Sequence, residues 1–172
     1  MEKEKLEQNQ NQNEKPMSAF VKAIVTGVIG GLLWSFLGAV THYFNFSSVS
    51  PATFLIRSWL QTKWSDGWLG ELLAIIALGL ISILIAILYY ALLRKMKGIW
   101  PSIVFGVVLW FLVFYLLQPI FPNIKSMTKL TSDTVVTTVC LFILYGTFIG
   151  YSISYEYYDS IKQNEPKSKA ET

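Results

Sequence analysis

The amino-acid sequence predicts an all-α membrane protein: a four-helix transmembrane bundle with a short amphipathic interfacial helix between spans one and two. The chain has 172 residues, of which 53% are hydrophobic and only 15% are charged, whereas about one quarter of the residues of soluble domains are charged. It also contains four long apolar segments, and roughly 20 apolar residues suffice for a helix to cross a hydrocarbon core of about 30 Å. We therefore expect the chain to fold in the lipid bilayer.

The four predicted spans are separated by charges, prolines and polar loops. An uncharged run from Ala23 to Phe46 defines the first span, and a basic cluster that starts at Arg94 ends the second. Pro119 ends the third, because proline disrupts a continuing helix. We place the spans at about residues 21–45, 71–93, 100–118 and 134–155. Since only a few residues separate spans two and three, we expect these two spans to be antiparallel neighbours.

Two polar tails flank the predicted membrane domain, which covers residues 19–156. Residues 1–18 and 157–172 are rich in polar and charged side chains, and such segments bury too little apolar surface to become ordered. Neither tail carries a polybasic patch, although the formal net charge of the chain is +3. We therefore predict disordered cytoplasmic tails that bind no nucleic acid.

The connection between spans one and two is predicted to contain a short helix at about residues 51–64. Ser50 is a favourable N-cap, and Pro51 suits the first helical position, where an N–H group has no helical partner. Apolar residues then recur at helical spacing, and Trp59 and Trp64 are typical of the boundary between membrane and water. The segment is too short to cross the bilayer, so we expect it to lie in the interface.

The distribution of basic residues predicts the orientation of the chain. Four spans place both termini on one side, and ten of the 14 Lys and Arg residues fall on that side. The other four are Arg57, Lys63, Lys125 and Lys129. Because basic residues in short loops stay on the cytoplasmic side, we predict that both termini are cytoplasmic.

Small residues recur every four positions on three of the spans. Lipid is as apolar as Leu, so transmembrane helices associate through close backbone approach, dispersion and hydrogen bonds between helices. We therefore predict helix-packing contacts at Ala23, Gly27, Gly31, Ser35, Ala39, Ser102, Gly106, Gly146, Gly150 and Ser154. These stripes fit two arrangements, contacts within the bundle or a homodimer.

Two tryptophans, Trp34 and Trp110, fall near the middle of their spans. Tryptophan prefers the membrane interface, so both positions need a reason. Either each indole N–H finds an acceptor in a neighbouring span, or each ring fills space opposite a glycine.

Four polar residues are expected near the outer ends of the spans: His42, Arg57, Asp66 and Glu71. Glu71 lies at the mouth of span two, where partial desolvation favours pairing with Arg57 or His42. His42 can act as an acid or a base only with such partners. The same residues are also consistent with interfacial anchors and loop charges that have no chemical role.

The sequence offers little for metal, nucleotide or ion chemistry. Cys140 is the single cysteine and His42 the single histidine, so we expect neither a disulfide within the chain nor a Cys/His zinc site. Common catalytic motifs such as the P-loop and G-x-S-x-G do not occur in the sequence. The middle of the spans carries no charged side chain of the kind that ion pathways use. We therefore expect no metal, no cofactor and no enzymatic activity.

Several motifs in the loops and at the span ends resemble those of a known family. They are WSFLGAVTHYFN at residues 34–45, SP at 50–51, DGWLG at 66–70, RKMKGIW at 94–100 and PIFP at 119–122. With them, the chain from about Ala19 to Tyr155 resembles the YqhR family of conserved membrane proteins from Bacillus-type Firmicutes. The resemblance implies a location in the bacterial cytoplasmic membrane. It identifies no catalytic or other functional residue in this chain.

Three functions are compatible with the sequence. The first, which we favour, is a non-enzymatic structural or partner-binding component of the membrane that contacts lipids, a membrane-protein partner or a second copy of itself. The second is a small transporter or lipid-handling protein with an apolar groove between its spans, which a tightly filled bundle would exclude. The third is an enzyme of the outer leaflet that uses His42 and Glu71.

Overall fold

The computed structural model describes residues 19–59, 67–96, 98–121 and 129–164, and it confirms the all-helical prediction, with no strand in these segments. The helical elements are α2 (Ala19–Tyr43), α3 (Pro51–Phe54), α4 (Ile56–Trp59), α5 (Trp68–Leu93), α6 (Trp100–Phe111), the π-helical turn η1 (Leu112–Leu116), the 3-10 turn η2 (Gln118–Ile120) and α7 (Ser132–Asn164). Three of them, α2, α5 and α7, are long and apolar enough to cross a membrane, and α6 with η1 forms a shorter apolar helix.

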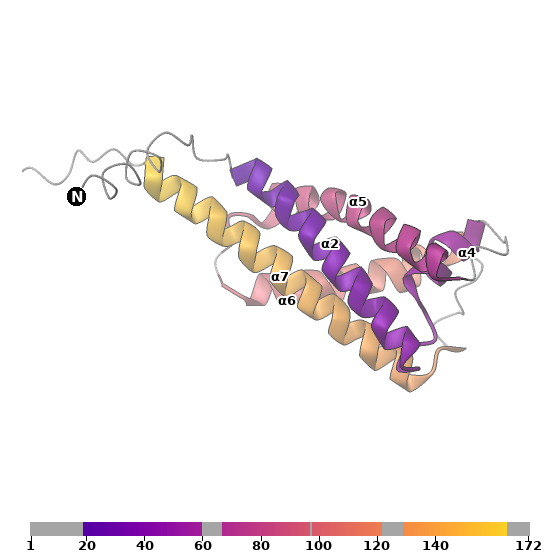
Figure 1. Cartoon of the computed structure of the whole chain (residues 1–172). Coiled ribbons are helices and arrows are strands. Elements are labelled where there is room, and N and C mark those ends of the chain that lie inside the picture. Colours follow the sequence, from indigo (N-terminus) through magenta and orange to yellow (C-terminus); the bar gives the residue numbers. More distant parts are fainter. Residues whose placement is uncertain (1–18, 60–66, 97, 122–128, 165–172) are drawn as a thin grey trace, which may run out of the picture.

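The four long helical segments lie side by side (Figure 1). Helix α2 packs against both α5 and α7, and α6 packs against α7. The start of α2 and the end of α7 lie at the same end of the molecule, which we call the terminal end. Helices α3 and α4 lie at the opposite end, which we call the distal end.

Glycines hold the helix pairs at very short separations. A β-carbon at Gly27 on α2 would lie 2.7 Å from the Cβ of Ala86 on α5, and one at Gly146 on α7 would lie 2.5 Å from the Cα of Gly106 on α6. No larger residue fits at this spacing without moving a neighbouring helix. Such close backbone approach is the means by which helices associate in lipid, where apolar burial supplies no driving force.

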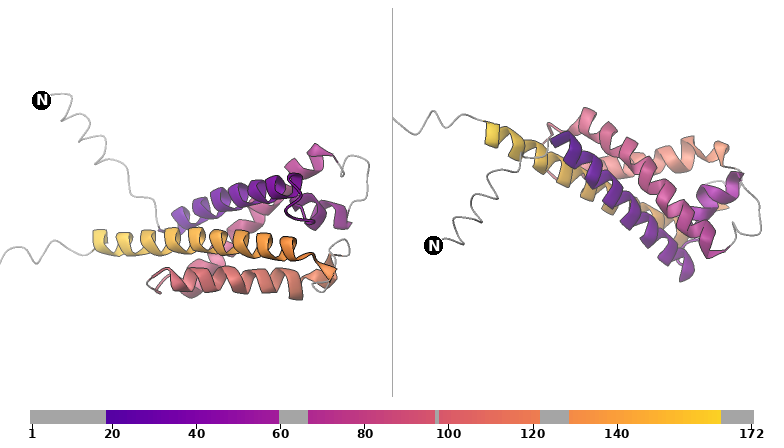
Figure 2. Two further views of the ribbon diagram at one scale, coloured as in Figure 1. Left: turned by 90° about the horizontal axis from the view of Figure 1, so that it is seen from below. Right: turned by 45° about the horizontal axis from the view of Figure 1, so that its top comes forward.

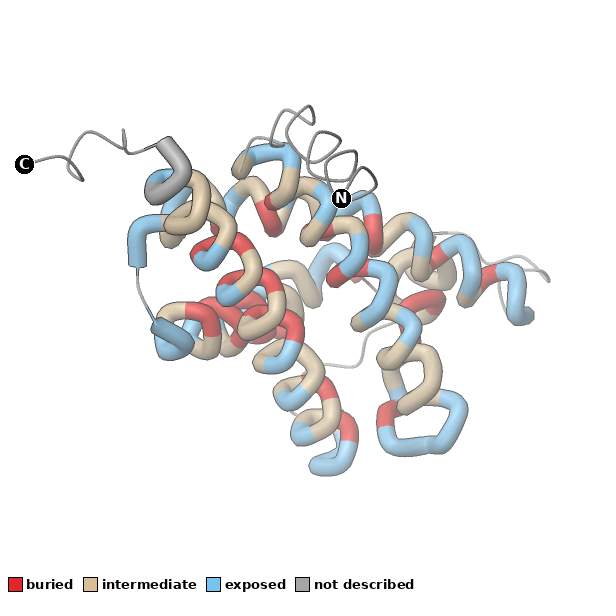
Figure 3. The backbone as a smooth tube through the Cα atoms, turned by 60° about the vertical axis from the view of Figure 1, so that its left-hand side comes forward, coloured by how far each residue is buried: buried red, intermediate tan, exposed pale blue. Residues whose placement is uncertain are grey.

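The outer surface of the molecule is apolar along its length. Large side chains that face outward include Phe36 on α2, Leu84 on α5, Val108 on α6 and Leu144 on α7. Figure 3 shows buried positions recurring on the sides of the helices that face each other, with exposed positions between them. Exposing this apolar surface to water would cost free energy, whereas exposing it to hydrocarbon does not.

Helices α5 and α6 are neighbours at the terminal end only, which limits the expectation that spans two and three pack together. There the Tyr89 ring meets the Phe105 ring at 4.9 Å, and the Tyr89 hydroxyl lies 3.1 Å from the Ser102 hydroxyl. Towards the distal end α2 moves away from α7 (Figure 2). The two helix pairs, α2 with α5 and α6 with α7, therefore diverge.

The end of α7 corrects the predicted boundary of the C-terminal tail. The sequence placed residues 157–172 in a disordered tail, but α7 continues as a helix to Asn164. An ion pair of 2.5 Å joins Glu156 to Lys22 on α2, and the Arg94 guanidinium lies over the rings of both Tyr90 and Tyr157. These contacts hold the last turns of α7 against α2 and α5. Residues 1–18 and 165–172, the rest of the predicted tails, lie outside the described residues.

The predicted interfacial helix at residues 51–64 is also corrected where the structure describes it. The helix breaks at Leu55 into α3 and α4, and α3 is buried against α5 and α2 rather than lying on the surface, with Ala52 0% exposed. The reason is a carboxylate of α5 that draws the start of α3 into the bundle. Residues 60–64 and the side chain of Trp59 lie outside the part of the chain that the structure describes.

Substituting Gly31 should show that the close helix contacts determine stability. In Gly31→Ala the new methyl group would meet Ser82 and Gly79 of α5, and such overpacking costs about 1–3 kcal/mol. Gly38→Ala is the matched control on the same helix, because the nearest atom, Pro51 Cγ, would lie at an ordinary 3.8 Å. Thermal unfolding of the purified variants should show a lower midpoint for Gly31→Ala alone. Equal midpoints would contradict the packing described for α2 and α5.

Candidate functional site

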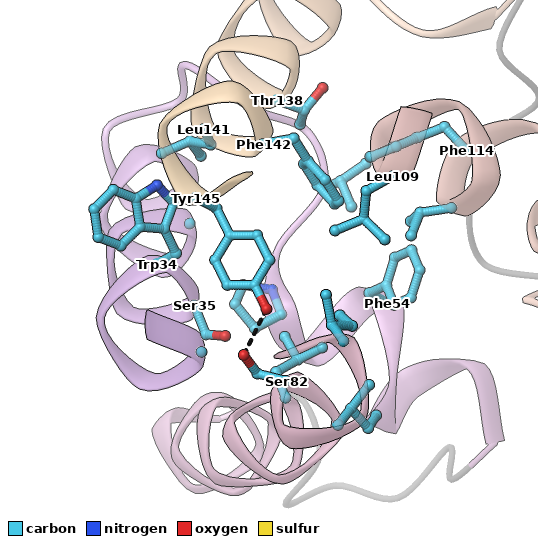
Figure 4. Close-up of a pocket in the computed structure, with 18 of the residues that line it drawn as sticks. Trp34, Ser35, Phe54, Ser82, Leu109, Phe114, Thr138, Leu141, Phe142 and Tyr145 are labelled. Atoms are coloured by element: carbon cyan, nitrogen blue, oxygen red, sulfur yellow. Dashed lines mark hydrogen bonds between the residues drawn. The ribbon is translucent and has the colours of Figure 1, made fainter. Parts of the chain in front are cut away.

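A cavity of about 350 Å³ lies between the diverging helix pairs, in the distal half of the molecule (Figure 4). Residues of α2, α3, α5, α6, η1 and α7 line it. Its volume is within the range of about 300–1,000 Å³ that is typical of small-molecule sites. The molecule is therefore not a tightly filled bundle.

The lining of the cavity is almost wholly apolar, and none of the described side chains that form it carries a charge. Leu78 and Ile81 of α5 lie on one side, and Leu109 of α6 and Val113 of η1 lie on the other. Cavities lined by such residues stay free of water and bind apolar guests. The lining thus favours a hydrocarbon group as the occupant.

The floor of the cavity, made of Ser82, Ile85 and Tyr145, faces the terminal end. The Ser82 hydroxyl donates to the Gly27 carbonyl at 2.6 Å, so the Tyr145 hydroxyl, 2.5 Å from Ser82 Oγ, donates to Ser82. Below this chain of hydrogen bonds the helices are in close contact, with Tyr89 fully buried. The cavity therefore ends near the middle of the bundle.

The roof of the cavity, made of Pro51 and Phe54 of α3, faces the distal end. Glu71 of α5 fixes it: the Ser50 hydroxyl donates to Glu71 Oε1 at 2.6 Å, and the Ala52 N–H donates to Oε2 at 3.3 Å. Ser50 Oγ also accepts the Thr53 N–H at 3.1 Å, as an N-cap does. Both oxygens of the Glu71 carboxylate are thus used to fasten α3 to α5.

Threonines of α7 hold the other side of the roof. The Ser48 N–H donates to Thr134 Oγ1 at 2.9 Å, which ties the segment before α3 to α7. One turn further along α7, Thr138 Oγ1 accepts the indole N–H of Trp110 at 3.0 Å and donates to the Thr134 carbonyl at 2.7 Å. The roof is therefore attached to both diverging helix pairs, and it keeps them apart.

The cavity opens sideways between α5 and η1. Among the described residues that line the cavity, Ile81 and Leu112 are the two most exposed, at 39% and 38%. Residues 112–116 form a π-helical turn at this opening, and π-helical turns within α-helices are frequent at functional sites. A molecule in the surrounding hydrocarbon would reach the cavity from this side.

The structure brings together two of the four polar residues considered as a site. Arg57 Nη2 lies 3.8 Å from Glu71 Oε1, and Arg57 Nη1 donates to the Thr53 hydroxyl at 3.1 Å. His42 instead places Nδ1 2.8 Å from the Ser47 carbonyl. Asp66 lies outside the described residues. Among the described residues no group of three His, Cys, Asp or Glu side chains is placed to hold a metal.

The small residues divide between helix contacts and the cavity. Buried contact positions are Ala23, Gly27, Gly31, Ser102, Gly106, Gly146, Gly150 and Ser154. Gly31 also lines the cavity, as Ser35 does, and Ala39 is half-buried. The four-residue stripe missed Gly30, where a β-carbon would lie 2.9 Å from Ile149 Cδ1 of α7. The adjacent pair Gly30 and Gly31 was the signal that α2 touches two helices at once.

The two mid-span tryptophans have different surroundings. Trp110 has its acceptor in Thr138 and stacks on Phe114 with the ring centroids 5.3 Å apart. Trp34 stacks on Phe148 at 5.4 Å, and its buried indole N–H has no partner among the described residues. The hydrogen-bond explanation thus fits Trp110, whereas the Trp34 ring stacks on Phe148 and lines the cavity.

The model of the conserved membrane protein family YqhR matches residues 2–168 of the chain. The chain belongs to the YqhR family. A relative from Bacillus subtilis (strain 168), whose name is "Uncharacterized protein YqhR", is 46% identical over 154 residues, which cover 88% of this chain and 86% of the relative. No solved structure matches the chain. The family resemblance seen in the loop motifs is confirmed, and YqhR membership makes the chain a membrane protein.

Glu71 substitutions should show what holds the roof in this YqhR family member. Glu71→Ala removes the acceptors of the Ser50 hydroxyl and the Ala52 N–H, and hydrogen bonds to a charged group are worth about 1.5–3 kcal/mol. Glu71→Gln keeps one carbonyl acceptor and should lose less. In thermal unfolding the order of midpoints should be wild type, Glu71→Gln, Glu71→Ala. A Glu71→Ala protein as stable as wild type would show that the carboxylate does not hold α3.

Proposed function

We propose that this protein crosses the bacterial cytoplasmic membrane four times and binds an apolar molecule from the bilayer in its cavity without catalysing a reaction on it. The observation that carries the proposal is the apolar cavity of about 350 Å³, whose described lining is most exposed at Ile81 and Leu112. In this proposal the protein is a lipid-handling component of the membrane.

The four-span topology is supported by the shape and surface of the third helix. Residues Trp100–Leu116 form a continuous apolar helix, which at about 1.5 Å per residue extends roughly 25 Å. Val104 and Val108 on its outer side are exposed in the same way as the residues of the longer spans. Slight bilayer thinning accommodates a span that is a few ångströms short.

The physical state of the cavity supports an apolar occupant. An empty cavity deprives its lining atoms of dispersion contacts, and water would find few hydrogen-bonding partners along the walls. Hydrocarbon surrounds the opening at Ile81 and Leu112. A guest drawn from this medium restores the lost contacts without a desolvation cost.

The positions of the polar residues support binding rather than catalysis. Glu71 uses both carboxylate oxygens to hold α3, and the Nδ1 atom of His42 faces a backbone carbonyl. Neither residue lines the cavity. A bound apolar molecule would therefore meet hydroxyl groups and hydrocarbon, but neither of the two residues considered for acid or base chemistry.

The small-residue contacts make lipid handling the better proposal than partner binding. Gly27 and Gly31 face α5, and Gly30 faces α7 of the same chain. The small-residue face of α2 is thus occupied within the molecule, so it offers no free surface to a second copy. The cavity is a feature that partner binding does not require.

Filling the cavity should remove the bound molecule. In Val113→Trp a large ring would project from η1 into the cavity, whereas Val108, one and a half turns earlier, is 55% exposed on the outer surface and does not line the cavity. Native mass spectrometry of wild type purified in mild detergent should show an added apolar mass. Val113→Trp should retain it at least several-fold less, and Val108→Trp should retain it as wild type does. Equal retention by both variants would contradict the proposed function.

The orientation is tested by a C-terminal tag in intact cells. The excess of Lys and Arg on the side of the termini supports a cytoplasmic location for both ends. External protease should leave the tag intact until the membrane is permeabilised. Digestion in intact cells would invert the proposed topology.

A further inference from the structure

We infer that the occupant of the cavity is one acyl chain of an outer-leaflet phospholipid, with its methyl end at the floor and its glycerol end at the roof. This inference rests on the proposed function, because it names the molecule that the same cavity binds.

The depth of the cavity matches one leaflet. On α2 the lining positions run from Gly31 to Thr41 along one side of the helix. This part of α2 rises about 15 Å, which is half of a hydrocarbon core of about 30 Å. An acyl chain that enters from one leaflet fills this length, and a molecule that spans both leaflets does not fit.

Described residues close both ends of the cavity, so we expect an acyl chain to enter from the side. At the floor, the hydrogen bond between Tyr145 and Ser82 and the close contact of Gly27 with Ala86 block passage towards the terminal end. At the roof, Phe54 packs on Phe121 with the ring centroids 4.5 Å apart. The chain would therefore bend in between α5 and η1 and would not continue into the other leaflet.

The distribution of charge complements an amphiphile. The described residues of the lining are uncharged from floor to roof, which suits the acyl chain. The ion pair of Arg57 with Glu71 lies beside α3 at the roof, at the level where a head group would lie. With the termini in the cytoplasm, the distal half of the molecule occupies the outer leaflet, which fixes the leaflet of the lipid.

Phospholipid is favoured over a rarer apolar molecule by mass action. Occupancy depends on the ratio of ligand concentration to the dissociation constant, and phospholipid is the medium in which the protein is dissolved. Even weak binding of a single chain therefore keeps the cavity occupied.

Photoreactive phospholipids test which end of the acyl chain lies at the floor of the cavity and which lies at the roof. The probes are two phosphatidylethanolamines, one with a diazirine near the acyl carbonyl and one with a diazirine near the chain end, each in vesicles containing the full-length protein. After irradiation, mass spectrometry of peptides locates the adducts. The chain-end probe should label Ile85 or Tyr145 at the floor, and the carbonyl probe should label Phe54 or Leu117 near the roof. Fully buried Ile153 lies outside the cavity and should stay unlabelled.

The Val113→Trp and Val108→Trp variants provide the matched comparison. Adducts at the floor should fall several-fold in Val113→Trp and stay unchanged in Val108→Trp, while labelling of outward-facing Leu84 stays the same in both. A reversed gradient, with the chain-end probe at the roof, would overturn the inference. Absence of cavity adducts from a protein that still retains an apolar mass would also overturn it but leave the proposed function standing. Loss of both signals would overturn both.

Discussion

The close backbone contacts at glycine determine the shape of this protein. In lipid, the burial of Leu and Ile supplies no hydrophobic driving force, so helices associate where small residues let backbones touch. Gly27 and Gly31 place α2 on α5, and Gly106 and Gly146 place α6 on α7. Contacts of Gly30 with Ile149 and of Tyr89 with Ser102 join the two pairs in the middle and at the terminal end, and the pairs separate towards the distal end.

The separation of the helix pairs becomes a stable cavity only because α3 is held between them. Glu71 binds the start of α3 from α5, and Thr134 binds the preceding segment from α7. Without these hydrogen bonds the apolar walls would have no reason to stay apart, since closing the gap recovers dispersion contacts. Glu71 and Thr134 near the distal end therefore act on the shape of an apolar site.

The sequence predicts the parts of this fold that depend on local pattern. Long uncharged runs predicted the apolar helices, and Ser50 with Pro51 predicted the start of α3. The break at Leu55 and the extension of α7 to Asn164 depend on tertiary contacts, namely Glu71 on α3 and Lys22 with Arg94 on α7, which no local pattern contains. The location of the cavity could not be predicted from the sequence either. Ile81 or Leu109 would have the same sequence signature in a packed core, on a lipid-facing surface or around a cavity.

The most direct test of a lipid-filled cavity is nuclear magnetic resonance of methyl-labelled, otherwise deuterated protein in bilayer discs with protonated lipid chains. Leu109 lines the cavity and is only 6% exposed, whereas Ile149 is 0% exposed in the closed part of the bundle. We expect magnetisation transfer from lipid chain protons to the Leu109 methyls and none to the Ile149 methyl. A Leu109 signal as free of lipid transfer as that of Ile149 would contradict the account.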